Sequence, residues 1–123
     1  MTATAQSFAD PAQTTTFTHG HEQVVEVDGT SVGLVTFEPG WRWSNDLRPL
    51  VGTESCPFVH RGYMLSGALH IEMIDGSTLD LRGGDVFVIS PHHDAWVVGD
   101  DAVQFLDWGG KAREYAQPAV EAS

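Results

Sequence analysis

The chain has 123 residues, a length that fits one domain with a single hydrophobic core. Acidic residues outnumber lysine and arginine by 17 to 6, and the formal net charge of -11 disfavours binding to nucleic acid or an anionic membrane. One cysteine excludes an internal disulfide, and the absence of a signal-like start or a long apolar run predicts a soluble cytoplasmic protein.

The first predicted segment, residues 1–16, consists mainly of small and polar residues, and Phe8 is its only sizeable apolar side chain. Such a segment buries too little surface to offset the entropy lost on ordering. We therefore expect a flexible N-terminal arm. The alternative is a strand exchanged at the edge of a dimer.

From Gln23 onward, short runs of β-branched and aromatic residues alternate with turn residues such as Asp28-Gly29 and Asp75-Gly76. The runs cover residues 24–27, 32–37, 62–65, 68–73, 77–81, 85–89, 95–98 and 102–108. About eight strands at this spacing predict an all-β sandwich or barrel. We assign residues 17–110 to this single domain and residues 111–123 to a C-terminal tail, where we expect any helix to lie.

Residues 86–89 and 97–98 are apolar without alternation, which is typical of strands covered on both faces. A second subunit covering one face would account for this, so a homodimer is predicted. Residues 41–53 interrupt the strand rhythm, and we expect a long loop there, in the kind of position where function is often found.

The first polar cluster is Glu54, Cys56 and His60, whose even spacing places all three side chains on one face if the segment is extended. Carboxylate, thiolate and imidazole together suit zinc or iron. The structural alternatives are a solvated Glu54, a Cys56 that acts as a small buried hydrophobe, and a His60 that is hydrogen-bonded in the core.

The second polar cluster is His92-His93-Asp94, which follows an apolar strand. Adjacent imidazoles rarely bind one ion together, so we expect one histidine to face inward and favour His93. Asp94 is a candidate for orienting an imidazole through its second nitrogen. Two solvated turn histidines are the alternative, and His70 is expected to face outward from its strand.

Aromatic and cationic residues near these clusters are candidates for a substrate pocket, although most aromatic rings belong to the core in small β domains. We assign substrate-binding roles to Trp41, Arg42, Trp43, Tyr63 and Trp96. Arg42 is suited to a substrate carboxylate. The chain has no nucleophile elbow, phosphate-binding loop or dinucleotide fingerprint.

Two stretches, His60-Arg-Gly-Tyr-Met-Leu-Ser-Gly-Ala-Leu-His and Gly83-Gly-Asp-Val-Phe-Val-Ile-Ser-Pro, resemble the two signature motifs of the cupin superfamily. The resemblance covers roughly residues 32–108, and residues 93–99 with Gly40-Trp-Arg-Trp-Ser look similar to small single-domain bacterial cupins. It implies a cupin-type double-stranded β-helix, or jelly-roll barrel, with short terminal tails and commonly a dimer.

The resemblance also implies a set of metal ligands. Aligning the first motif on residues 63–67 puts Glu54 and Cys56 at the two usual histidine positions and His60 at the usual glutamate position. A second-motif turn shortened by two residues puts His93 at the final histidine position. It leaves His92 where the motif usually has a glycine, a position that often needs a positive φ.

We therefore predict a divalent transition metal (zinc, iron, manganese or nickel) held by Glu54, Cys56, His60 and His93. The predicted function is a metal-dependent cupin enzyme acting on a small aromatic or carboxylate-bearing molecule, as an oxygenase, an isomerase or cyclase, or a lyase. The alternative is a cupin that binds or senses a small ligand without catalysis. A third hypothesis is an interaction module that works through its acidic surface.

Overall fold

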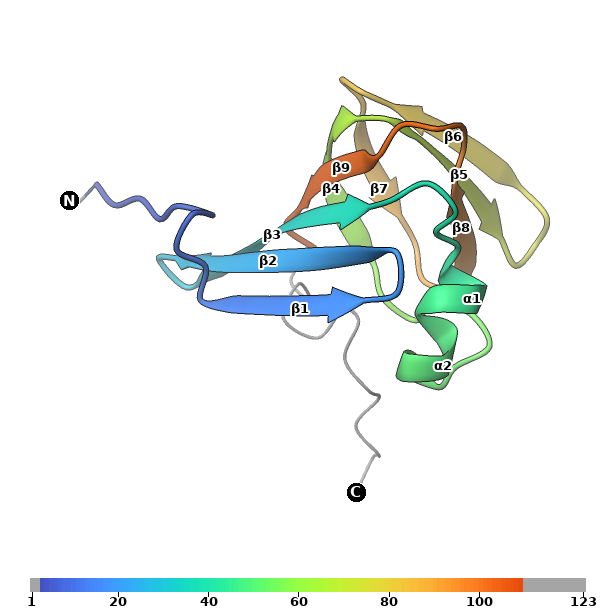
Figure 1. Ribbon diagram of the computed structural model, residues 1–123, viewed down its shortest axis with the longest axis horizontal. Coiled ribbons are helices and arrows are strands. Elements are labelled where there is room, and N and C mark those ends of the chain that lie inside the picture. The colour runs from blue at the N-terminus through green and yellow to red at the C-terminus, as the bar shows by residue number, and fades with distance from the viewer. Residues whose placement is uncertain (1–2, 110–123) are drawn as a thin grey trace.

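The computed structural model of the chain describes residues 3–109. Within this range the chain forms nine strands and two short helices (Figure 1). In chain order they are β1 (Gln13–Phe17), β2 (Gly20–Val27), β3 (Thr30–Phe37), α1 (Trp43–Asp46), α2 (Arg48–Val51), β4 (His60–Ser66), β5 (Ala68–Met73), β6 (Thr78–Arg82), β7 (Val86–Ile89), β8 (His93–Val97) and β9 (Val103–Asp107).

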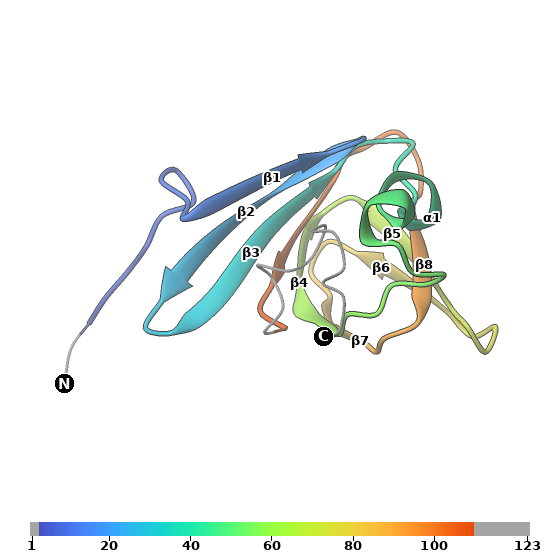
Figure 2. The ribbon, with the colours of Figure 1, turned by 90° about the horizontal axis from the view of Figure 1, so that it is seen from below.

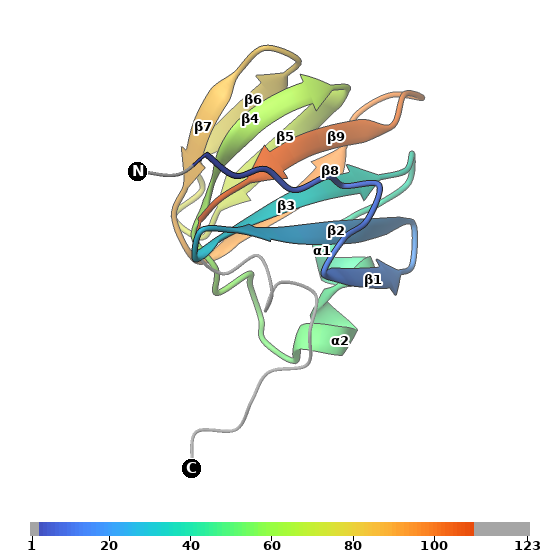
Figure 3. The ribbon, with the colours of Figure 1, turned by 90° about the vertical axis from the view of Figure 1, so that its left-hand side faces the viewer.

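The strands form two antiparallel sheets that face each other. One sheet has six strands in the order β1-β2-β3-β9-β4-β7, and the other has three in the order β6-β5-β8. Figure 3 looks onto the six-stranded sheet, with the three-stranded sheet behind it. Figure 2 shows that the six-stranded sheet extends through β1, β2 and β3 well beyond the three-stranded one. The predicted all-β jelly-roll architecture is confirmed.

Local turn chemistry explains where several strands end. Asp28 and Gly29 join β2 to β3, and both have positive φ, at 48° and 80°. Two successive positive φ values define the tight hairpin turn that Asp-Gly favours, because its twist matches that of the paired strands. The register then pairs Val27 with Thr30 and continues to Gly20 with Phe37.

Aromatic side chains fill the space between the sheets. Phe37 and Trp41 stack with ring centroids 3.6 Å apart and planes within 5°, and Phe105 meets Phe37 edge-on at 5.5 Å. Trp43 in α1 and Leu47 after it are also fully buried. The α1–α2 segment therefore closes the barrel by contributing large apolar side chains to its core.

Two details differ from the predicted organisation. Residues 13–16 of the predicted arm belong to β1, because their threonine-rich run pairs with β2 from Gln13 opposite Val24 to Phe17 opposite Gly20. The predicted loop at 41–53 contains α1 and α2, with Pro49 in the first turn of α2 and Gly52 in the left-handed conformation at its end. The predicted C-terminal tail, residues 111–123, lies outside the described residues.

Among residues 3–109, no helix is long and apolar enough to cross a membrane.

Candidate metal centre

Three buried side chains from different parts of the sequence converge in the barrel. Cys56 lies between α2 and β4, His60 is the first residue of β4 and His93 is the first residue of β8. One ligand atom from each lies within 4.8 Å of those of the other two. The imidazole rings of His60 and His93 are 5.3 Å apart and nearly perpendicular.

Backbone hydrogen bonds fix Cys56 beside the two histidines of the second cluster. The amide of Cys56 donates to the carbonyl of His93 at 2.9 Å, and the amide of His92 donates to the carbonyl of Cys56 at 2.6 Å. His92 has a φ of 72°, as expected for a residue at a glycine position. This turn directs His93 into the barrel while the side chain of His92 remains exposed.

Hydrogen bonds at Nδ1 orient both buried imidazoles. Nδ1–H of His60 donates to Oδ2 of Asp107 at 2.6 Å, and Nδ1–H of His93 donates to the carbonyl of Ser90 at 2.8 Å. The remaining ring nitrogen, Nε2, is the atom through which each histidine would bind a metal, and Nε2 of His60 lies 3.5 Å from Sγ of Cys56. A second nitrogen bound to a carboxylate or carbonyl is the usual arrangement of a metal-binding histidine, so the donor set fits a metal ion.

The charges of the group favour a thiolate. Burial raises the pKa of Cys56, but hydrogen bonds from His60 and His93 and the positive charge of those rings outweigh it and bring the pKa to about 6. Burial opposes the charged form of His60, yet the bonds to Asp107 and Cys56 raise its pKa. Cys56 is thus ready to act as the thiolate that metals bind.

A further buried polar group lies on β2. Glu22 is completely inaccessible, and neither carboxyl oxygen has a hydrogen-bond partner in the described part of the chain. Burial raises its pKa to about 9, and the negative charge of Asp107 contributes in the same direction, while the charge of His60 acts weakly against both. Glu22 is therefore a neutral carboxylic acid near neutral pH.

A small cavity of about 20 Å³ adjoins His60 and His93. Its wall is otherwise apolar and includes Phe37, Trp41, Trp43, Leu69, Ile71, Phe87, Ile89, Ala95 and Phe105. This volume is enough for one water-sized molecule. Within residues 3–109, the indole N–H groups of Trp41 and Trp43 are buried without a hydrogen-bond partner.

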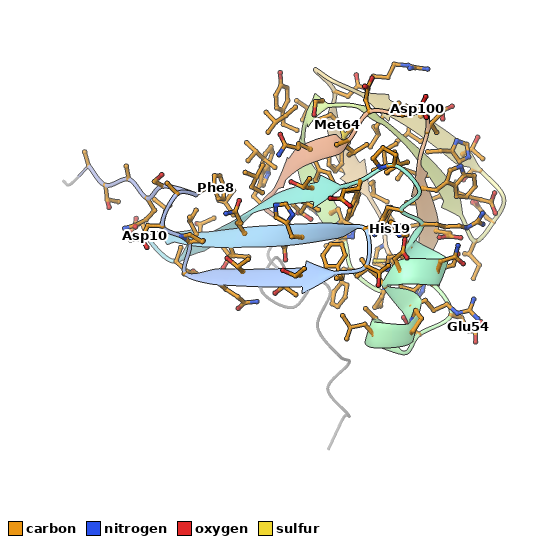
Figure 4. The ribbon with its side chains drawn as sticks, in the orientation of Figure 1. Phe8, Asp10, His19, Glu54, Met64 and Asp100 are labelled. Atoms are coloured by element: carbon orange, nitrogen blue, oxygen red, sulfur yellow. The ribbon has the colours of Figure 1, made fainter. Side chains whose placement is uncertain are left out.

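Glu54, predicted as a ligand, does not join the group. Its side chain is 94% exposed, and its carboxylate lies 4.0 Å from the Arg48 guanidinium. Figure 4 shows it at the surface of the loop after α2. The prediction assumed an extended segment, but residues 53–55 form a bend, so the even spacing from Glu54 to Cys56 does not place both side chains on one face.

Among the predicted substrate-binding residues, only Trp41 and Trp43 line the cavity. The Arg42 guanidinium lies 4.4 Å over the Trp96 ring and hydrogen-bonds Asp94 at 3.1 Å, on the outer side of β8. Tyr63 also points out of the barrel, because it alternates with the buried Gly62 and Met64 on β4. Asp94 thus binds Arg42 and orients no imidazole.

Sequence reasoning missed three residues that complete the site: Glu22, Ser90 and Asp107. Asp107 is the last inward position of β9, after Val103 and Phe105, and Glu22 lies two residues before the inward-facing Val24. A carboxylate in phase with buried apolar residues was the available signal. The Ser90 contribution is a backbone carbonyl, which no residue type could have indicated.

Several solved structures share this architecture. A Klebsiella pneumoniae protein with a double-stranded β-helix domain aligns with a TM-score of 0.56 and 18% identity over 86% of this chain and 84% of its own. A cupin-like protein from Thermotoga maritima gives 0.51 and 21% over 74% of this chain and 68% of its own. Oxalate decarboxylase from Lactobacillus farciminis gives 0.54 and 20% over 77% of this chain but only 30% of its own.

The fold is that of the cupins. At these identities the likeness establishes the architecture, and a cupin's reaction has to be argued from its own site. No protein-family model matches the sequence, and no curated protein matches it with significance. In this chain, the Cys56, His60 and His93 group is the feature from which function can be argued.

Proposed function

We propose that this chain is a metal-dependent cupin enzyme whose single ion is held by Sγ of Cys56 and Nε2 of His60 and His93. The observation that carries the proposal is the convergence of these three buried donors within 4.8 Å, with both Nδ1 atoms already engaged elsewhere. An uncharged core would not need a buried thiol and two oriented imidazoles at one point.

Zinc is the metal that this donor set favours. Thiolate and imidazole are its common protein ligands, whereas manganese prefers the oxygen ligands that Glu54 does not supply here. Zinc bound by three protein ligands, with a fourth position open, acts as a Lewis acid and lowers the pKa of bound water. Hydration, isomerisation and lyase reactions are therefore favoured over oxygen chemistry.

The chain's own residues define what the site does to a substrate. The aromatic wall excludes bulk water and strengthens electrostatic interactions at the ligands. Asp107 and the Ser90 carbonyl hold the two imidazoles in fixed orientations. Because the cavity is about 20 Å³, the reacting part of the substrate must be small, or Trp41 and Trp43 must move to admit it.

A second candidate is a cupin that binds a small ligand without catalysis. The small cavity favours it, because a mostly apolar pocket of about 20 Å³ suits one compact ligand better than a turnover site. It needs no metal. Metal content therefore separates the two candidates.

The test is metal analysis by plasma mass spectrometry on tag-free protein purified with supplemented zinc, iron, manganese or nickel. We expect near-stoichiometric zinc in the wild-type protein. The metal should be lost in Cys56→Ser, His60→Ala and His93→Ala variants that remain folded by circular dichroism. A folded wild-type protein without bound metal would contradict the proposal and favour the ligand-binding module.

Matched controls come from the same segments. His92→Ala removes the exposed imidazole next to His93, and Glu54→Ala removes the exposed carboxylate near Cys56. Both variants should retain the metal of the wild-type protein. Loss of metal in His92→Ala with retention in His93→Ala would show that His92, and not His93, is the ligand, and would contradict the proposed centre.

We also propose that the protein works in the cytoplasm. Its only cysteine is buried and placed as a ligand, so the site requires a reduced thiol. Reducing compartments maintain thiols in that state. Activity or metal binding that survives full oxidation of Cys56 would contradict this location.

A further inference from the structure

A second hollow adjoins the proposed metal centre from outside the barrel. It is a surface groove of about 310 Å³ between the loop before β4, the β5–β6 turn and the start of β8. His93 lines both this groove and the inner cavity. Two other surface hollows, one beside residues 6–12 and one between β1 and the two helices, include none of the three proposed ligands. Of these three hollows, the groove is the one from which a molecule can approach the centre.

The approach past α1 and α2 is blocked by packing. Trp41 and Trp43 are each 1% exposed, and Trp41 stacks on Phe37 with ring centroids 3.6 Å apart. Leu47 and Val51 continue the same buried surface. Moving this segment would expose two indole rings and two aliphatic side chains to water, which is costly. A substrate that approaches through the groove leaves this packing intact.

The groove contains a carboxylate that has no cationic partner. Glu72 on β5 lies directly opposite Asp94 on β8, and like charges in that relationship destabilise a pair of strands. The charge of Asp94 is compensated, because Asp94 accepts hydrogen bonds from the Arg42 guanidinium and from the Ser44 amide, each at 3.1 Å. Within residues 3–109, Glu72 forms no ion pair. A bound cation would relieve the repulsion between the two carboxylates.

The rest of the groove suits the other parts of a small organic cation. Ile74 is 78% exposed and follows Met73, so apolar surface lies close to Glu72. Glu54 adds a second carboxylate, and its contact with Arg48 at 4.0 Å joins two largely exposed groups, which makes it weak. The net charge of -11 gives the surface a negative potential that attracts cations. A cationic group is therefore favoured there over a carboxylate.

We infer that the groove binds the ammonium group of an amine-bearing small molecule, with Glu72 as its main ion-pair partner. The rest of the molecule would contact Met73 and Ile74 and reach the metal centre beside His93. This inference rests on the proposed function, because it names the substrate class of the same centre. Glu72 is not one of the proposed ligands, so binding of the cation does not depend on the metal.

The test compares three compounds that share a butyl chain: butyltrimethylammonium, butanol and butyrate. Butyltrimethylammonium is positively charged but has no lone pair to bind a metal, so its binding reports on the groove alone. NMR titration of the isotope-labelled full chain, with zinc and without metal, measures each Kd. We expect the cation to bind at least ~10-fold more tightly than the other two compounds in both forms, and less tightly as salt is added.

Two variants, each with one carboxylate fewer, separate the groove from the net charge. Glu72→Gln should raise the Kd of butyltrimethylammonium about 5- to 10-fold and leave that of butanol unchanged. Asp100→Asn is the matched control, because Asp100 is exposed and lies at the other end of the molecule from Glu54 (Figure 4). It should bind the cation like the wild type. Thermal unfolding checks that both variants are folded.

Equal affinity for the cation and for butanol would overturn the inference. Equal losses of affinity in Glu72→Gln and Asp100→Asn would also overturn it, because the attraction would then come from the net charge. Zinc-loaded protein that does not bind the cation would contradict the amine site and leave the proposed metal centre intact. Wild-type protein that binds no metal but binds the cation through Glu72 would support the amine site and contradict the metal-dependent enzyme.

Discussion

Oδ2 of Asp107 lies 2.6 Å from Nδ1 of His60, and both side chains are buried. The second carboxylate oxygen accepts the amide of Gly109 at 2.9 Å, so Asp107 is itself held in place. His60 is thereby fixed with Nε2 toward Cys56. The orientation of the proposed centre depends on a residue at the end of the last strand.

Asp107→Asn is expected to weaken metal binding by about 10- to 100-fold, since the amide no longer favours the imidazole orientation or raises its basicity. Competition against a chelator of known affinity measures the effect. Asp94→Asn is the control, because Asp94 binds Arg42 outside the barrel. Equal metal affinity for Asp107→Asn and wild type would show that Asp107 does not contribute to metal binding.

The raised pKa of Glu22 predicts how the stability of the fold changes with pH. The unfolded chain releases this proton near pH 4.5, whereas the folded chain holds it until about pH 9. The free energy of unfolding therefore retains the full contribution of Glu22 below pH 4.5 and loses it as pH rises toward 9. As pH rises across that window, the free energy of unfolding of Glu22→Gln should increase relative to that of the wild type by about 1.4 kcal/mol per pH unit.

Urea unfolding of metal-free protein at several pH values measures this slope. Glu38→Gln, a change at an exposed residue, should follow the wild-type curve. Parallel curves for Glu22→Gln and wild type between pH 5 and 8 would show that Glu22 is ionised in the folded protein, contrary to its burial.

Gly62→Ala should destabilise the fold by about 3 kcal/mol or more, since overpacking at a rigid site is costly. Gly62 lies between Asp107 and Phe87 in the six-stranded sheet, and an added Cβ would fall 1.9 Å from the Leu106 carbonyl oxygen. In Gly83→Ala the nearest atom is 3.3 Å away, so that control should lose less than ~1 kcal/mol. Thermal unfolding compares them, and equal losses would argue against the tight packing at Gly62.

Removing the metal should lower the thermal midpoint. A ligand at 1,000 times its Kd stabilises the folded state by about 4 kcal/mol. Chelation of the zinc-loaded protein should therefore lower its free energy of unfolding by about that amount. Differential scanning calorimetry with and without chelator gives the shift. His93→Ala should show no such shift. A chelator effect of wild-type size in His93→Ala would place the metal elsewhere.

The fold was predictable because its signals are local. The Asp28-Gly29 turn and the alternation along β5 each lie within a few residues, and the strands follow from them. β1 was missed because three threonines were counted only as polar residues, although threonine favours strands. The helices after Trp41 were missed because four-residue helices are too short for a periodic pattern to be detected.

The site was predictable only in part. Cys56, His60 and His93 are brought together as the sequence suggested, whereas Glu54 is separated from them by a bend that residue spacing cannot reveal. Asp107 is 47 positions from His60, and its role depends on the register of β9 against β4. Such long-range pairing becomes visible only when the sheet is assembled.

The three proposed ligands do not belong to one sheet. His60 begins a strand of the six-stranded sheet and His93 a strand of the three-stranded one, and within the described chain no strand of either sheet pairs with a strand of the other. An ion bound at this point would cross-link the two layers. Metal binding would then stabilise both sheets together, and amide hydrogens in β8 should exchange more slowly in the metal-bound protein than in the metal-free protein.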